Sequence, residues 1–177
     1  MAASMGRGFA AAVVAYVAMQ LCYTAFFKSI ALLDVMVIAT GFVLRAVAGA
    51  TAIDVDISPW LILCTFFLSL FLALCKRRQE KVVHVADEQR SAVRDYSARL
   101  LDLLVGIAAT STILSYTLYT MSPVTAGKFG TDRLYVTIPF VVFGLFRYLH
   151  LVFARNEGER PEKTLLTDGV IIAHKRM

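Results

Sequence analysis

The sequence has few charged residues for its length, and three long stretches contain none at all. Charged residues make up 18% of the 177 residues, whereas a soluble domain is usually nearer a quarter charged. No Asp, Glu, Lys or Arg occurs in residues 9–27, 57–75 or 103–121. Each stretch is long enough to cross a hydrocarbon core of roughly 30 Å as a helix. This scarcity of charge argues against a soluble domain and predicts a multi-pass membrane protein.

Residue patterns that mark several other protein classes are missing as well. The three cysteines, Cys22, Cys64 and Cys75, lie in or at the ends of apolar stretches, without metal-binding spacing or the pattern of a disulfide-rich secreted domain. The sequence has no glycine-rich phosphate loop, nucleophile elbow or zinc-binding spacing, and His84 and His174 are isolated. We therefore assign no metal ligand within this sequence.

The net charge of +5 does not indicate nucleic-acid binding, because the basic residues flank the apolar stretches. That arrangement is typical of membrane loops that face the cytoplasm. We expect membrane lipid, and no nucleic acid, as a partner.

The apolar pattern predicts an all-α fold, a transmembrane helical bundle in one membrane domain that covers residues 1–177. About five membrane helices are expected, at 9–27, 30–53, 57–75, 101–121 and 134–154. Residues 1–8 are too short and too weakly basic to begin a signal peptide, so the first helix is expected to stay as an anchor. Residues 76–100 form a polar, mostly helix-compatible segment, and 155–177 form a polar tail.

Local signals support these boundaries. Ser58 before Pro59 is a good N-cap followed by proline at the first helical position. Pro139 either starts the fifth helix or kinks it. Small residues in the second helix, among them Ala39 and Gly41, would let a neighbouring helix approach closely.

Basic residues are distributed unevenly between the loops. Residues 51–58 contain none and carry Asp54 and Asp56, whereas residues 76–99 contain seven Lys or Arg. The positive-inside rule therefore places 76–100 in the cytoplasm and 51–58 outside. Lys28, in the short turn between the first two helices, is then cytoplasmic by alternation.

The strongest candidate for chemistry is the run from Lys76 to Lys81. On a continued helix Lys76 and Glu80 are four residues apart and Arg77 and Glu80 three apart, so they share a face. Among the adjacent cations Lys76, Arg77 and Arg78, at least one can point into the bundle. Such a cluster suits a phosphate or pyrophosphate. The alternative is a stop-transfer cluster that meets anionic lipid headgroups, although such a cluster has no need of Glu80.

A second candidate pair lies on the same cytoplasmic side. Asp34 follows Lys28 by six residues and would place a carboxylate within the membrane end of the bundle, where it must be paired or hydrated. Lys28 could clamp a phosphate with Asp34 orienting it, or Asp34 could simply be neutralised by Lys28 or by another helix.

Three further polar residues fall inside the apolar helices. Arg45 lies ~16 Å deeper than Asp34 along the second helix; it would snorkel outward or pair with an acid elsewhere, and a structural role is favoured. Arg147 and His150 share a face of the fifth helix, where interfacial anchoring is favoured over a part in the phosphate site.

Several short motifs in a fixed order resemble one known family. They are Tyr23 to Lys28, Leu33-Asp34-Val35, Gly41 to Gly49, Ile57 to Trp60, Lys76 to Glu80, Ile138 to Phe140 and Phe146 to Tyr148. Together they resemble the bacterial decaprenyl-phosphate phosphoribosyltransferase branch of the UbiA prenyltransferase family, over most of residues 14–168.

The resemblance implies an enzyme of the bacterial inner membrane with its active side in the cytoplasm. It would transfer 5-phosphoribose from phosphoribosyl pyrophosphate to a polyprenyl phosphate with Mg²⁺, in cell wall biosynthesis. Lys28 matches the lysine of the family's Tyr-to-Lys turn, Asp34 is the acid after it, and Lys76, Arg77 and Glu80 match the second polar motif. We predict Asp34 and Glu80 as catalytic residues and Lys28, Lys76, Arg77 and Arg78 as phosphate-binding residues.

The resemblance also implies parts that lie outside this sequence. The family's first motif, an Asn-Asp followed by spaced aspartates that bind the metal, would lie before Met1, and a further helix would follow Asp168. We therefore expect a fragment that is inactive alone and that needs the missing N-terminal helices as a partner.

Two other functions stay open. One is an aromatic prenyltransferase of the same family, against which the basic run Lys76 to Glu80 argues, because such enzymes usually carry paired aspartates there. The other is a non-catalytic membrane scaffold or transporter subunit, in which Asp34 and Arg45 would line a path.

Overall fold

The computed structural model describes residues 7–53, 55, 57–83 and 95–154, and its described elements are all helical. The predicted polar tail and all of residues 84–94 lie outside the described residues. The elements are α1 (Arg7–Ala25), η2 (Phe27–Ser29), α2 (Leu33–Ala52), α3 (Pro59–Val83), α5 (Ala98–Met121), α6 (Pro123–Phe129), η3 (Leu134–Thr137) and α7 (Ile138–Ala154).

Each of the five predicted apolar segments forms a helix, which confirms the predicted fold class. Four of the helices are long and apolar enough to cross a membrane, α7 counted together with η3, and Phe9–Ala25 is a shorter apolar helix. Some boundaries differ from the predicted spans: α2 begins at Leu33 and not at residue 30, and α3 continues eight residues beyond Cys75 to Val83. Lys, Arg, Gln and Glu are good helix formers, so the end of the apolar run marks the expected membrane edge and not the end of the helix. The short helix α6 was not predicted.

Local chemistry explains several helix ends. Pro59 is the first residue of α3, and the Ser58 carbonyl accepts the Leu61 and Ile62 N–H groups, so the predicted start of this helix is confirmed. The Ser97 side chain accepts the Leu100 N–H at 3.1 Å and caps α5. Pro139 is the second residue of α7, where its missing N–H costs no intrahelical bond; it starts the helix and does not kink it.

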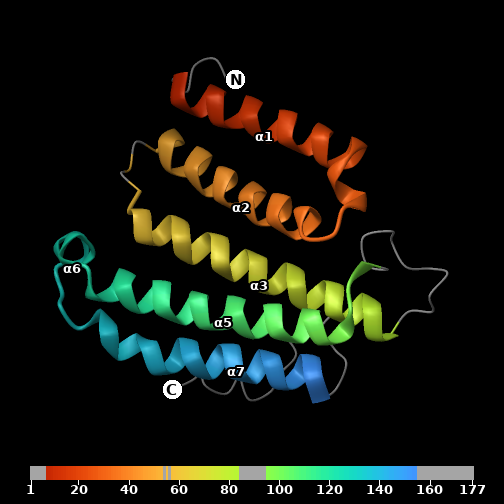
Figure 1. Cartoon of the computed structure of the whole chain (residues 1–177). Coiled ribbons are helices and arrows are strands. Elements are labelled where there is room, and N and C mark those ends of the chain that lie inside the picture. Colours follow the sequence, from red (N-terminus) through yellow and green to blue (C-terminus); the bar gives the residue numbers. More distant parts are fainter. Residues whose placement is uncertain (1–6, 54, 56, 84–94, 155–177) are drawn as a thin grey trace.

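The long helices follow one another in the order α1, α2, α3, α5 and α7 in Figure 1. Each packs mainly on its neighbours in sequence. The α7 helix also packs on α3, where the Phe71 and Tyr148 rings meet edge to face at 5.7 Å. Large apolar side chains stay exposed on several helices, among them Val14, Leu21, Phe42, Ile107 and Phe146.

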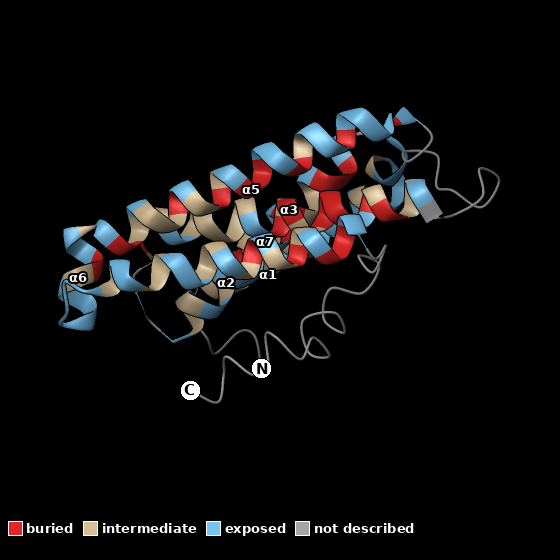
Figure 2. Cartoon of the chain, turned by 90° about the horizontal axis from the view of Figure 1, so that it is seen from below, coloured by how far each residue is buried: buried red, intermediate tan, exposed pale blue. Residues whose placement is uncertain are grey.

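The buried core is concentrated toward one end of the helical bundle, where α2 begins and α3 ends. Buried residues of α3 begin at Ser69 and continue to Gln79, and those of α2 lie in its first half, from Asp34 to Gly41. Figure 2 shows the same uneven distribution along the helices. Ala39 and Gly41 are buried, as the prediction of a close helix approach requires. This tightly packed end holds Asp34, Arg77 and Glu80, three of the polar residues predicted from the sequence.

Candidate functional site

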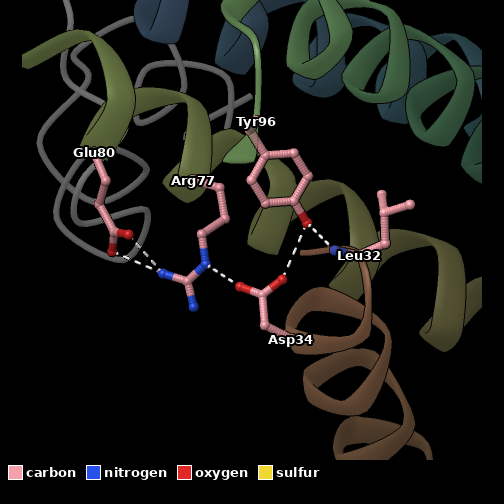
Figure 3. A network of polar contacts seen from close by, with 5 residues as sticks. All are labelled: Leu32, Asp34, Arg77, Glu80 and Tyr96. Atoms are coloured by element: carbon pink, nitrogen blue, oxygen red, sulfur yellow. Dashed lines mark hydrogen bonds and ion pairs between the residues drawn. The ribbon is translucent and has the colours of Figure 1, made fainter. Parts of the chain in front are cut away.

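Asp34 and Arg77 form a buried ion pair that joins α2 to α3 (Figure 3). Arg77 Nε donates to Asp34 Oδ2 at 2.6 Å, and the two side chains are 3% and 1% exposed. Asp34 lies in the first turn of α2, where the helix dipole favours a negative charge. The carboxylate is thus neutralised by another helix, which was one of the two possibilities left open by the sequence.

Glu80 holds the other side of the same guanidinium. Arg77 Nη1 donates to Glu80 Oε1 at 2.9 Å and to Oε2 at 2.7 Å. The two residues are three apart on α3, so the predicted shared face is confirmed. With all three groups ionised, one guanidinium lies between two carboxylates, and the cluster carries one excess negative charge. Two sides of Arg77 are therefore occupied by protein carboxylates.

Tyr96 completes this network, although no motif or spacing in the sequence predicts its part in the site. Its hydroxyl donates to Asp34 Oδ1 at 3.0 Å and accepts the Leu32 backbone N–H at 2.6 Å. Tyr96 is 2% exposed, and burial first, then the nearby Asp34 carboxylate, raise its pKa to about 12. The phenol therefore stays protonated near neutral pH and can donate to Asp34.

The turn that precedes Asp34 has an unusual backbone conformation. Leu32 has φ of 68°, the only positive φ at a non-glycine residue in the described chain. A side chain at positive φ is strained by roughly 1–2 kcal/mol. The bond from the Leu32 N–H to Tyr96 holds this turn against the start of α5, so one tyrosine fixes both the turn and the carboxylate that follows it.

The three adjacent cations of α3 point in different directions, as expected. Arg77 faces inward, while Arg78 Nε donates to Asp102 of α5 at 2.7 Å and its Cζ lies 3.7 Å from the centre of the Phe153 ring of α7. Arg78 thus links three helices. Lys76 is exposed, and within the described part of the chain it forms no ion pair.

Lys28 lies at the same end of the bundle as the network of Asp34, Arg77, Glu80 and Tyr96. It is exposed in η2, just before the Leu32 turn, and makes no ion pair with any described residue. Lys28 and Lys76 are therefore two cations whose charge is not neutralised by a described carboxylate. The phosphate-binding role of Lys28 and Lys76 stays a prediction.

Two further predicted residues lie on α7. His150 is exposed and lines a cavity of about 400 Å³ between α5 and α7, together with Asp102 and Phe153. Arg147 is half-buried. The hydrogen bonds that the Asp34, Glu80 and Tyr96 side chains make with described residues involve neither Arg147 nor His150. The other two histidines, His84 and His174, lie outside the described residues.

The described residues do not form a ready magnesium site. Residues 7–53, 55, 57–83 and 95–154 contain no group of three or more His, Cys, Asp or Glu placed to hold a metal ion. Asp34 and Glu80 both accept hydrogen bonds from Arg77, and a cation there would have to displace the guanidinium. Asp34 and Glu80 therefore serve as partners of Arg77 and not as metal ligands in this arrangement.

Comparison with known proteins gives a consistent result. A model of the UbiA prenyltransferase family matches residues 1–168. Proteins named decaprenyl-phosphate phosphoribosyltransferase are 29% identical over 175 residues in Corynebacterium glutamicum, 30% over 164 in Mycolicibacterium smegmatis and 32% over 162 in Mycobacterium tuberculosis. These alignments cover 96%, 88% and 89% of this chain but 51%, 51% and 52% of the relatives. The chain spans about half the length of the curated relatives it matches.

Proposed function

Because the chain belongs to the UbiA prenyltransferase family, a family of multi-pass membrane transferases, we propose that it contributes to transfer of 5-phosphoribose from phosphoribosyl pyrophosphate to a polyprenyl phosphate. The names of its relatives support this substrate pair. Since the chain spans about half of their length, the complete activity is proposed for this chain together with the remaining half. The proposed location is the bacterial inner membrane, with the polar network on the cytoplasmic side.

The observation that carries the proposal is the distribution of charge at the tightly packed end of the bundle, where α2 begins and α3 ends. Arg77 is held by two carboxylates and Arg78 by Asp102 and Phe153. Lys28 and Lys76 are exposed at the same end and free of described ion pairs. A pyrophosphate leaving group accumulates negative charge as its bond to the ribose breaks, and fixed cations beside it stabilise that charge.

Each group then has a defined part in the proposed reaction. Lys28 and Lys76 bind the phosphates of the donor. Arg77 presents its remaining Nη2 donor, which no described bond uses, while Asp34 and Glu80 fix the guanidinium. Asp34 and Glu80 are therefore proposed as positioning residues rather than as the catalytic groups predicted from the sequence. Tyr96 fixes Asp34 in turn.

Magnesium is expected from the family, and its chemistry would be to neutralise the charge of the pyrophosphate. Because the carboxylates of Asp34 and Glu80 are both bonded to Arg77, ligands for the metal are proposed to come from outside the described residues. The part of this chain is to supply cations and to hold their geometry.

The test measures donor affinity in a reconstituted enzyme. The chain would be co-expressed with the part of the Corynebacterium glutamicum relative that it does not cover, and phosphoribosylated decaprenyl phosphate would be measured with and without Mg²⁺. We expect no product from the chain alone and product from the pair. Lys76→Gln should raise KM for phosphoribosyl pyrophosphate at least ~10-fold, the effect of losing about 1.4 kcal/mol of binding.

Arg133→Gln is the matched control, because Arg133 is exposed in the loop before η3 and forms no ion pair with the described residues. It should leave KM within about twofold of the parent. Thermal stability should be unchanged for both variants, since neither side chain is paired. A pair that transfers a prenyl group to an aromatic acid, or a Lys76→Gln variant with unchanged KM, would contradict the proposed substrate or the proposed role.

A further inference from the structure

A cavity of about 210 Å³ lies between α1 and α2, away from the polar network. Its α1 wall carries three polar side chains, Tyr16, Gln20 and Tyr23. These residues are four and three apart, so they share one face of the helix. Arg45 of α2 lies beside them. A polar stripe facing an arginine is unexpected between two helices that are otherwise apolar and lie within the predicted membrane stretch.

Arg45 is bonded to a tyrosine and not to a carboxylate. Its Nη2 donates to the Tyr16 hydroxyl, and its Cζ lies 4.7 Å from the centre of the Tyr16 ring and 5.1 Å from that of Phe42. The carboxylate nearest in sequence on α2 is Asp34, eleven residues or ~16 Å along the axis, and Arg77 already holds it. Of the two possibilities left open for Arg45 by the sequence, pairing with an acid is not found among the described residues.

This arrangement has an energetic consequence. An arginine in the middle of a membrane helix is costly to insert unless its N–H donors find partners. One hydroxyl and two aromatic rings offset part of that cost, but a guanidinium has five N–H donors and the Tyr16 bond uses one. An anion in the adjoining cavity would use the others.

The shape and lining of the cavity favour a phosphate over a smaller anion. A guanidinium fork grips two phosphate oxygens at once, and Tyr16, Gln20 and Tyr23 line the same cavity with two hydroxyl groups and an amide. Gly41 lets α1 lie close to α2 at this cavity, because a Cβ there would lie 3.1 Å from Met19 Cε and 3.6 Å from the Tyr16 ring.

The position of the cavity favours a lipid as the source of that phosphate. Arg45 lies well inside α2, about 10 Å before its last residue, where a free inorganic anion would have to leave water. Val37, Ile38 and Phe42 form an apolar side of the cavity, which suits a chain attached to the phosphate. We propose that the α1–α2 cavity binds the phosphate group of a membrane lipid through Arg45 and Tyr16.

The experiment titrates the purified full chain in neutral detergent with dioctanoyl phosphatidic acid, dioctanoylglycerol and inorganic phosphate. We expect saturable binding of the phosphatidic acid and at least ~10-fold weaker binding of the other two. Dioctanoylglycerol lacks the charged phosphate that Arg45 would hold, and inorganic phosphate lacks the acyl chains that would contact the apolar side of the cavity. Arg45→Gln should weaken the phosphatidic acid by at least ~10-fold. The Arg133→Gln control should stay within about twofold.

Tyr16→Phe serves as a second variant, because it keeps the ring against Arg45 and removes only the hydroxyl. It should weaken binding of the phosphatidic acid by a smaller factor, about 3–10-fold, with an unchanged helical circular dichroism spectrum. Equal binding of dioctanoylglycerol would overturn the phosphate, and equal binding of inorganic phosphate would overturn the lipid. A wild-type chain that binds none of the three, or an Arg45→Gln chain that binds as the parent does, would overturn the site.

Discussion

Removing Arg77 should destabilise the bundle far more than removing its neighbour Lys76. Arg77→Met keeps a side chain of similar length but leaves the Asp34 carboxylate, 1% exposed, with the Tyr96 hydroxyl as its remaining described partner. Breaking a buried ion pair by deleting one partner costs about 3–5 kcal/mol. Lys76→Met deletes the same charge one residue earlier on α3, at an exposed position without an ion pair, and should cost less than ~0.5 kcal/mol.

A double-mutant cycle isolates the pair itself. Asp34→Leu should cost less than Arg77→Met, because Glu80 still satisfies the guanidinium through two bonds. In the double variant Glu80 loses its ion-pair partner, but its side chain is 14% exposed and reaches solvent. The Tyr96 hydroxyl loses its acceptor in both Asp34 variants, so this loss cancels in the cycle. The two single costs should therefore exceed the double cost by about 2–4 kcal/mol.

The assay is reversible unfolding in mixed micelles with increasing sodium dodecyl sulfate, followed by helical circular dichroism. Glu80→Gln adds an internal check, since it removes the more exposed carboxylate and should cost less than Asp34→Leu. If the two single costs add within ~0.5 kcal/mol, or if Arg77→Met costs no more than Lys76→Met, the buried pair does not hold α2 against α3 and the reasoning fails.

Three further outcomes follow from the same structure. Burial raises the pKa of Tyr96 to about 12, against 10.0 for the free side chain. Because the folded state holds the phenol proton more tightly than the unfolded state, the free energy of unfolding should fall by about 2–3 kcal/mol as pH rises from 10 to 12. Tyr96→Phe should remove this pH dependence, whereas the exposed control Tyr135→Phe should keep it. Leu32→Gly should relieve the strain at φ 68° and raise unfolding free energy by up to ~1 kcal/mol, so a lower midpoint in denaturant would contradict a strained turn. In a chain freed of its native cysteines, a cysteine at Val55 should react with an impermeant reagent from outside the cell and one at residue 85 should not; the reverse labelling would invert the topology predicted from the loop charges.

Less of the Arg77 guanidinium is available to an anion than the sequence predicts, for a physical reason. A run of cations suggests anion binding because charge is read from the sequence one residue at a time. In the fold, Arg77 and Arg78 are each bonded to carboxylates on other helices or on the next turn, and Lys76, between the apolar run and the two arginines, is the member of this trio left exposed. Charge composition predicted where cations gather, while helix packing decided which of them is available.

The sequence by itself determined the elements that depend on local interactions. Runs of apolar residues fixed the four long apolar helices and the shorter apolar helix Phe9–Ala25, because each run must satisfy its own backbone hydrogen bonds in a membrane. Ser58 with Pro59 fixed the start of α3, and the spacing of Arg77 and Glu80 placed them on one helical face.

Only the tertiary structure decided the contacts between residues far apart in the chain. Asp34 is 43 residues from Arg77 and 62 from Tyr96, and Arg45 is 29 from Tyr16. Helical periodicity says which residues share a face but not which face of another helix it meets. That choice depends on side-chain packing between whole helices, including the small residues that let them approach. It made Arg77 the partner of Asp34 in place of Lys28, and it gave Tyr96 a part in the site.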